Sequence, residues 1–196
     1  MSLPLPTASL EQSFLSARTF SQFTDQPVPD ALLHQLYDLA KWGPTSMNCQ
    51  PARLVFVRSP EAKARLKLAL APGNADKTMA APVTAIVAMD TRFFDHLPEQ
   101  FPAMNAKPMF EGNAALAEAT AFRNSSLQGA YLILAARQLG LDCGPMSGFD
   151  ATKVNEQFFP DGRFQANFLV NLGYGKAGTT YPRGPRLPFE TACSIA

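Results

Sequence analysis

The sequence predicts an α+β fold that forms one domain over residues 1–196. The chain is 46% hydrophobic and 17% charged, so it can bury a substantial core. Its strand-like runs are separated by clusters of helical segments, which favours α+β over strict β-α-β alternation. No internal repeat, low-complexity run or linker divides the chain into two domains.

Two helices are expected before the first strand. Ser9 is the predicted N-cap of a helix over Leu10–Phe20. Asp30 is the predicted N-cap of a second helix, which Gly43-Pro44 ends. One face of this second helix is apolar at a spacing of 3.6 residues, formed by Leu32, Leu33, Leu36, Leu39 and Ala40.

The next segments alternate between strand and helix. Leu54–Val57 and Pro82–Met89 are apolar runs typical of buried strands. Between them, Ser59-Pro60-Glu61 begins a helix that reaches about Leu70, and Pro72-Gly73-Asn74 interrupts it. The region 93–108 holds three prolines and is expected to be irregular, as a lid or a mobile segment.

The second half is organised around one long helix, expected over Ala114–Leu139 and ended by Gly140. A short helix capped by Asp150 and a third strand follow, over Ala151–Phe158 and Asn167–Leu172. The tail from residue 173 carries three prolines and cannot be regular. It also carries apolar side chains, so we expect it to pack along a partner subunit.

Charge and cysteine content exclude several classes of protein. Lys and Arg number 17 against 16 Asp and Glu, so the charge gives no case for nucleic acid or an anionic membrane surface. No apolar run is long enough to span a bilayer, and residues 1–12 lack the features of a signal peptide. Three widely spaced cysteines predict free thiols in the cytoplasm, and no spacing of Cys or His predicts a metal site.

Two loops concentrate polar side chains and flexible backbone. Residues 42–51 carry hydroxyls and an Asn/Gln pair that suit a heterocycle or a polyol, although a capped turn explains them equally well. Residues 140–150 hold three glycines and a proline, which let the backbone approach a ligand. The Gly-x-Gly-x-x-Gly pattern at 173–178 is interpreted as a turn, because prolines follow where a dinucleotide fold needs a helix.

Single ionisable residues give weaker signals. Arg18, Arg183 and Arg186 suit an anionic ligand, although a lone surface arginine is usually only solvated. The histidines at positions 34 and 96 form no catalytic arrangement with a nucleophile. Cys49 has no neighbour in sequence that would lower its pKa, so we do not expect it to be a nucleophile.

In combination, these segments resemble the FMN-dependent nitroreductase family over nearly the whole chain. The resemblance rests on four motifs in order, namely Ala17-Arg18-Thr19, Pro44-Thr45-Ser46-Met47-Asn48-Cys49-Gln50-Pro51, Gly144-Pro145-Met146-Ser147-Gly148-Phe149-Asp150 and Arg186-Leu187-Pro188. Three further segments, Lys41–Ser46, Ala80–Ala88 and Thr120–Ser126, together with Gly144–Asp150, look like the malonic semialdehyde reductases of bacterial pyrimidine degradation.

The resemblance implies a nitroreductase-like sandwich, with a mixed, mainly antiparallel sheet flanked by helices, in an intertwined homodimer. FMN and NAD(P)H are the implied cofactors. The FMN phosphate is assigned to Arg18, Thr19 and Arg186, and the flavin and ribityl chain to Pro44, Thr45, Ser46 and Asn48. The backbone around Pro145, Met146, Ser147 and Gly148 is assigned to contact the flavin ring from the other subunit. Because only two arginines are assigned to the phosphate, we expect weaker FMN binding than is usual in the family.

The implied reaction is hydride transfer from NAD(P)H through flavin N5 to malonic semialdehyde, giving 3-hydroxypropionate. Arg123 is the candidate for binding the substrate carboxylate, with a structural ion pair as the alternative. No residue is assigned as a catalytic acid. Three other readings stay open: a broad nitro- or quinone reductase, a flavin-binding protein without turnover, and a protein without a cofactor.

Overall fold

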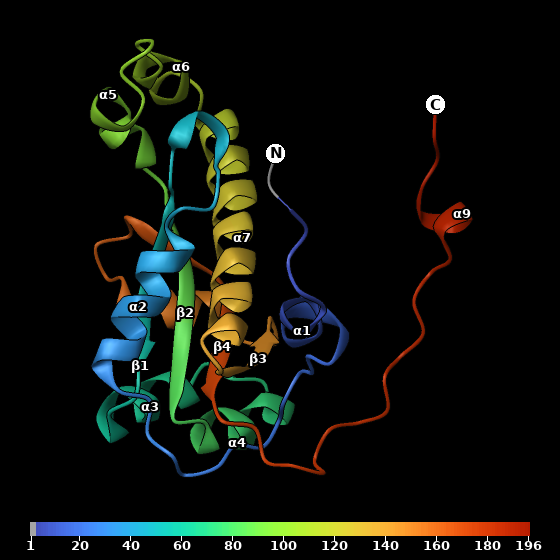
Figure 1. The fold of residues 1–196 in the computed structure, drawn as a ribbon. Coiled ribbons are helices and arrows are strands. Elements are labelled where there is room, and N and C mark those ends of the chain that lie inside the picture. The colour runs from blue at the N-terminus through green and yellow to red at the C-terminus, as the bar shows by residue number, and fades with distance from the viewer. Residues whose placement is uncertain (1–2) are drawn as a thin grey trace.

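The protein is a layered α+β structure, described here by a computed structural model of residues 3–196 (Figure 1). Met1 and Ser2, which belong to the predicted domain 1–196, lie outside the described residues. Within them, one sheet has the strand order β1-β2-β4-β3, and all neighbouring strands are antiparallel. Its strands are β1 (Ala52–Val57), β2 (Val83–Asp90), β3 (Asp142–Met146) and β4 (Phe164–Gly173). The α+β prediction is confirmed.

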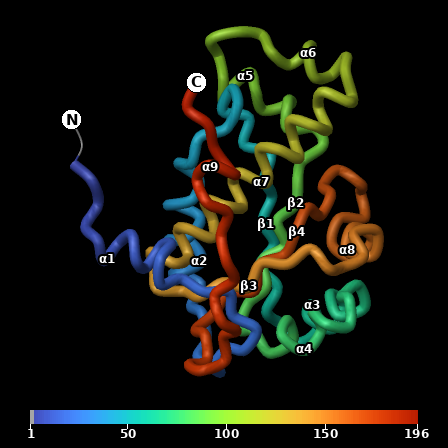
Figure 2. Tube along the Cα trace, turned by 90° about the vertical axis from the view of Figure 1, so that its right-hand side faces the viewer, coloured from blue at the N-terminus to red at the C-terminus, as the bar shows by residue number. Residues whose placement is uncertain are grey.

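Helices cover both faces of the sheet, as Figure 2 shows. Strand β2 is buried throughout, with Val83, Ala85 and Val87 facing one core and Ile86 and Ala88 the other. The first core packs against α2 (Asp30–Ala40) and α7 (Ala114–Gln138). The second face packs against α3 (Pro60–Lys67), α4 (Pro72–Ala80) and α8 (Ala151–Phe158).

The segment expected to be irregular is partly helical. It contains the 3-10 turn η3 (Phe93–His96), helix α5 (Leu97–Gln100) and, after a short loop, helix α6 (Lys107–Glu111). Phe93 and Phe110 pack edge to face in a small core of their own, with ring centroids 5.0 Å apart. This subdomain lies beyond one end of the sheet, above the first half of α7 (Figure 1).

Two further elements, α4 and β3, were not predicted from the sequence. Pro72 does end the preceding helix region, but it is also the first residue of α4, because proline at that position loses no helical hydrogen bond. The expected loop 140–150 contains β3, where Pro145 is tolerated because β3 is an edge strand. The predicted N-cap Asp30 is wrong, because Pro29 precedes α2 and Asp30 is its first residue. The predicted N-cap Asp150 of α8 is confirmed.

The predicted first helix is shorter and begins earlier. It comprises α1 (Thr7–Leu10) and a π-helical turn, η1 (Glu11–Leu15). The chain then becomes extended, because Thr19 forms a parallel bridge with Cys143 and the Phe20 N–H donates to the Cys143 carbonyl at 3.0 Å. Pairing with the edge of β3 therefore replaces the last turns of the expected helix.

The C-terminal tail extends away from the rest of the chain. Residues 181–196 are all exposed, and they include Tyr181, Leu187 and Ile195 at 81%, 71% and 91% exposure. Apart from α9 (Phe189–Ala192) the tail is irregular, as its prolines predict, and Figure 1 shows it standing away from the helices and the sheet. The apolar side chains of this tail are therefore not buried against the rest of the chain.

Candidate functional site

A basic cavity of about 600 Å³ lies beside β3 and the extended segment that follows η1. Its lining includes the cations Arg18, Lys77, Arg137, Arg183 and Arg186. No Asp or Glu is among the lining residues within the described part of the chain. Five cations without a compensating carboxylate favour an anionic ligand such as a phosphate.

The floor of the basic cavity depends on close backbone packing. Gly144 of β3 lies against the extended segment, and a Cβ built on it would come within 2.6 Å of the Phe20 carbonyl oxygen. Any larger residue at position 144 would push residues 18–20 away from the strand. Thr19 and Pro145 line the same cavity, so this packing brings two of the predicted motifs together.

The two tail arginines have different surroundings. Arg183 donates to the carbonyl oxygens of Leu15 and Ala17 at 2.6 and 3.0 Å, which ties the start of the tail to the N-terminal segment. Arg186 bonds within its own turn, to the carbonyls of residues 184 and 185. Arg186 can therefore turn its guanidinium to a ligand without breaking a tertiary contact, whereas Arg183 cannot.

The predicted Pro44–Pro51 motif forms a separate loop against the middle of α7; we call it the 44–51 loop. The Ser46 N–H donates to Asn124 Oδ1 at 2.9 Å, and Tyr131 donates its hydroxyl to the Pro44 carbonyl at 2.9 Å. Asn48 Nδ2 donates to the Gln100 carbonyl of α5 at 3.0 Å. The loop is thus fixed at three points by two different helices.

Three residues of the 44–51 loop have left-handed backbones. The φ values are 50° at Met47, 49° at Asn48 and 38° at Gln50. Asparagine tolerates this region, but for the other two residues it costs of order 1 kcal/mol each. Backbone strain of this kind is concentrated at functional sites, where the surrounding structure enforces it.

The predicted cofactor residues fall into two groups that line no common cavity in this chain. Arg18, Thr19, Pro145 and Arg186 line the basic cavity, and Met146, Ser147 and Gly148 continue along β3 into the next loop. Pro44, Thr45, Ser46 and Asn48 lie in the 44–51 loop. The loop bonds α7 at Asn124 and Tyr131, which precede the cavity residue Arg137 by thirteen and six residues, about 20 and 9 Å along the axis.

Two cations that line the cavity, Lys77 and Arg137, were not among the basic residues predicted to suit an anionic ligand. Lys77 lies on α4, a helix that was not predicted, and Arg137 lies in the last turn of α7. Arg183 was a candidate for an anionic ligand but was not assigned to the FMN phosphate. The expectation of weak FMN binding counts two arginines, whereas five cations line the cavity, and it stays a prediction.

The two remaining candidate residues are Arg123 and Cys49. Arg123 is exposed on α7, and it forms no ion pair within residues 3–196, so the structural ion pair considered for it is not observed. Burial raises the pKa of Cys49 to about 11. The Cys49 thiol is therefore neutral at physiological pH and unsuited to be a nucleophile, as expected.

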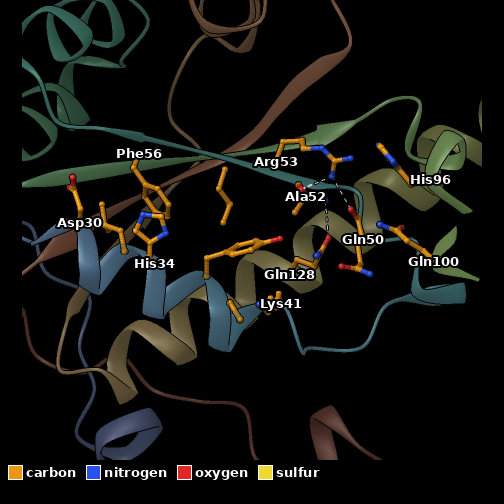
Figure 3. Close-up of a pocket in the computed structure, with 14 residues that line it drawn as sticks. Asp30, His34, Lys41, Gln50, Ala52, Arg53, Phe56, His96, Gln100 and Gln128 are labelled. Carbon is orange, nitrogen blue, oxygen red and sulfur yellow. Dashed lines mark hydrogen bonds between the residues drawn. The ribbon is translucent and has the colours of Figure 1, made fainter.

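A second cavity, the helix–strand groove of about 560 Å³, lies between α2 and β1. Its floor is largely apolar, with Leu33, Tyr37 and Phe56. Its polar end carries Arg53 and His96 (Figure 3). This end adjoins the 44–51 loop, because Arg53 donates to the Gln50 carbonyl at 3.0 Å.

The described residues contain neither a cluster of metal ligands nor a helix that could cross a membrane. In residues 3–196 no group of three or more His, Cys, Asp or Glu side chains could hold a metal ion. None of the described helices combines the length and apolar character needed to cross a membrane. The basic cavity and the helix–strand groove are the features of the described chain that indicate a function.

Comparison with known proteins agrees with this geometry. The sequence model of the Nitroreductase family matches residues 15–174. A Burkholderia lata protein named "Putative NADH dehydrogenase/NAD(P)H nitroreductase" is 62% identical over 191 residues, covering 97% of this chain and 98% of its own.

Solved structures show the same fold at lower sequence identity. A nitroreductase family protein from Streptococcus pneumoniae superposes with a TM-score of 0.82 at 22% identity, covering 97% of this chain and 100% of its own. An Exiguobacterium sibiricum protein, described as a "putative nitroreductase in complex with FMN", has a TM-score of 0.83 at 20% identity and covers 100% and 99%. The fold, the match over most of the chain and the close relative together show that this chain belongs to the nitroreductase family.

Proposed function

We propose that the chain is an FMN-dependent NAD(P)H oxidoreductase that acts as a homodimer in the cytoplasm. The observation that carries the proposal is the basic cavity, whose five cations are opposite in charge to a phosphate monoester and can donate hydrogen bonds to it. The FMN complex of the E. sibiricum structure and the NAD(P)H in the name of the B. lata relative support the choice of cofactors. The free cysteines at positions 49, 143 and 193 fit a reducing compartment.

The residues present fit FMN in their chemistry. Arg18 and Arg186 supply bidentate donors for the phosphate, with Thr19 beside them and Lys77 and Arg137 adding charge. The 44–51 loop supplies the hydroxyls and amides of Thr45, Ser46 and Asn48, which suit the flavin and the ribityl chain. When bound, FMN supplies the hydride-transfer chemistry between NAD(P)H and the substrate.

The separation of the two residue groups supports a dimer. The 44–51 loop bonds α7 at Asn124 and Tyr131, and the basic cavity contacts it at Arg137, about 9 to 20 Å further along the axis, so a second copy would bring the loop of one chain to the cavity of the other. The face of α7 turned away from the sheet is open and partly apolar, with Phe122 and Leu127 at 54% and 41% exposure. An exposed apolar helix face and tail of this kind indicate an interface between copies of the chain.

Within that dimer, the chain's own residues bind and orient rather than react. Pro145, Met146, Ser147 and Gly148 provide backbone against the flavin ring of the other subunit, and Gly148 is fixed by Asn74, which donates to its carbonyl at 2.7 Å. Backbone N–H groups near the N1–O2 edge would stabilise the negative charge of the reduced ring. No side chain is assigned as proton donor, so the substrate proton comes from water.

For the substrate we propose malonic semialdehyde, reduced to 3-hydroxypropionate. The supporting observation is Arg123, an exposed cation without an ion pair in the described chain, next to the Asn124 that holds the 44–51 loop. Its guanidinium would bind the substrate carboxylate. A broad nitro- or quinone reductase is the alternative, favoured by the nitroreductase name of the B. lata relative.

The visible absorption spectrum of the purified protein tests the proposal. We expect flavin bands that bleach with NADH or NADPH under anaerobic conditions and return when malonic semialdehyde is added. Recovery only with a nitroaromatic or a quinone would select the alternative substrate. Bleaching without recovery by any of them would indicate flavin binding without turnover, and absence of flavin after incubation with FMN would refute the proposal.

Arg123→Ala tests the substrate assignment separately. We expect a KM for malonic semialdehyde raised about tenfold or more, because the lost charge-assisted hydrogen bond is worth ~1.5–3 kcal/mol. The KM for an uncharged nitroaromatic should change little. Equal losses with both substrates would remove Arg123 from carboxylate binding.

A further inference from the structure

A buried carboxylate lies at the end of β2, outside both residue groups assigned to the cofactor. The side chain of Asp90 is fully buried, and two arginines neutralise it. Arg53 Nη2 lies 2.8 Å from Asp90 Oδ2, while Arg163 donates from Nε and Nη2 at 3.1 and 3.0 Å. His96 is further away, with Nε2 at 3.9 Å from the same carboxylate. A buried charge is retained only where such pairing compensates its desolvation.

One of these arginines also holds the 44–51 loop. The other amino group of Arg53, Nη1, donates to the carbonyl oxygens of Gln50 and Ala52 at 3.0 and 2.9 Å, as the dashed lines of Figure 3 show. The Asp90 backbone contributes directly, because its N–H donates to the Pro51 carbonyl at 2.8 Å. The Asp90–Arg53 pair therefore spans from the sheet to the last two residues of the loop.

The loop needs an external restraint at this point. Gln50 has a φ of 38°, which an unbranched side chain adopts only at a cost, and it follows two other left-handed residues. Inside the loop, the Gln50 N–H bonds Thr45 Oγ1 at 3.2 Å, and Gln50 Nε2 donates to Asn48 Oδ1 at 2.8 Å. Fixing the Gln50 backbone thus also fixes the side chain of Asn48, which is one of the proposed flavin contacts.

We propose that Asp90 and Arg53 are positioning residues for the cofactor: Asp90 orients the Arg53 guanidinium, which holds Gln50 and so keeps the 44–51 loop in its flavin-binding conformation. The proposal rests on the proposed function, because it takes the loop to be part of an FMN site. Neither residue belongs to the motifs that carry the family resemblance. Their action is transmitted through the Gln50 carbonyl.

Arg163 provides a matched comparison within the same ion-pair cluster. It bonds the same carboxylate as Arg53 and is about equally exposed, with 34% of its side chain accessible against 28% for Arg53. Its side-chain bonds go to Asp90 and to His96 and, within residues 3–196, none goes to the 44–51 loop. Removing either arginine leaves Asp90 with the other arginine and with the Arg92 N–H, which donates to Oδ1 at 2.9 Å, but only removal of Arg53 takes a bond from the Gln50 carbonyl of the loop.

The experiment compares Arg53→Met with Arg163→Met in the full chain. Thermal unfolding without FMN measures the structural cost, and quenching of FMN fluorescence measures the dissociation constant. We expect similar losses in Tm for both variants. Arg53→Met should raise the FMN Kd about tenfold and change the visible circular dichroism of FMN at saturation. Arg163→Met should change the Kd by less than twofold and leave the spectrum as in the wild type.

A third variant, Arg53→Lys, separates orientation from charge. Lysine keeps the charge beside Asp90 but lacks the planar fork that reaches carboxylate and carbonyls together, so FMN binding should remain weakened. Equal effects of Arg53→Met and Arg163→Met, or full recovery with Arg53→Lys, would overturn the positioning role. If the wild-type chain itself binds no FMN, the proposed function fails instead, so the two failures are distinguishable.

Discussion

Replacing Asn124 with alanine should loosen the 44–51 loop while leaving the body of α7 folded. Asn124 is 1% exposed, and its Oδ1 accepts the Ser46 N–H at 2.9 Å. Its Nδ2 donates to the Thr120 carbonyl at 2.9 Å, but that oxygen keeps its helical partner after the substitution. The main loss is therefore one of the two side-chain bonds that tie the loop to α7, the other being the bond from Tyr131 to the Pro44 carbonyl.

The size of the effect follows from this geometry. Leaving a half-buried N–H without a partner costs ~1–3 kcal/mol, so Asn124→Ala should destabilise the protein by about 2 kcal/mol. For a chain of this length, that corresponds to a decrease in Tm of roughly 4–8 °C. Because Ser46 belongs to the proposed flavin contacts, the FMN Kd should also rise, by about five- to tenfold if half to two thirds of that energy is needed to order the loop.

Asn113→Ala is the matched control in the same helix. Asn113 is the exposed N-cap of α7 and accepts the Leu116 N–H at 3.0 Å, so its removal should cost ~1 kcal/mol. Its side chain bonds Leu116 and, within the described residues, no residue of the 44–51 loop, so FMN binding should be unchanged. Thermal unfolding by circular dichroism and FMN titration measure both quantities. A Tm and a Kd of Asn124→Ala within error of the wild type would refute the reasoning.

Other expected outcomes follow from the basic cavity, the thiols and the tail. Arg186→Gln should weaken FMN binding at least tenfold in low salt. The Tm of the apoprotein should change little, because Arg186 makes no tertiary bond in the described chain. An unchanged FMN Kd would remove Arg186 from the phosphate site. Burial raises the pKa of Cys49 to about 11 and that of Cys143 to about 12, so at pH 8 only Cys193 should react with a disulfide reagent in the native protein, against three thiols in denaturant. Since both buried thiols ionise near pH 9.0 when unfolded, their contribution to stability is complete below that pH and should be lost as the pH rises towards 11–12, as urea unfolding at several pH values would show. Deleting residues 181–196 should shift the proposed dimer towards monomer in sedimentation velocity, and an unchanged mass would place the tail outside the interface.

Local sequence signals predicted the elements whose pattern lies within one segment. The long helix, the strand at 82–89, the helix start at Ser59-Pro60-Glu61 and the cap at Asp150 needed only periodicity and end signals. Strand β3 could not be predicted this way, because Gly144-Pro145 opposes a strand unless the segment is known to be at an edge. The same missing strand explains the overlong first helix, since residues 17–20 become extended by pairing with β3.

In the candidate site, too, sequence motifs predicted some residues, whereas others come together only through tertiary packing. Arg18 and Arg186 were assigned from motifs, and the structure places both in one cavity. Lys77 and Arg137 join them only through the packing of α4 and α7 around β3, which no spacing in the sequence reveals. Asp90 carries no motif either, because its partners Arg53 and Arg163 are 37 and 73 residues away in the chain.

The division of the site also limits how the proposed dimer can be built. The 44–51 loop contacts the middle of α7, whereas the basic cavity lies at the end of that helix beside Arg137. If two copies pack through the open face of α7 around a two-fold axis with their helices antiparallel, the middle of one helix approaches the end of the other. Each loop then meets the partner's cavity, and both sites form together. In such an assembly FMN binding and dimerisation are coupled, so the protein should bind FMN more weakly when it is diluted below its dimer dissociation constant.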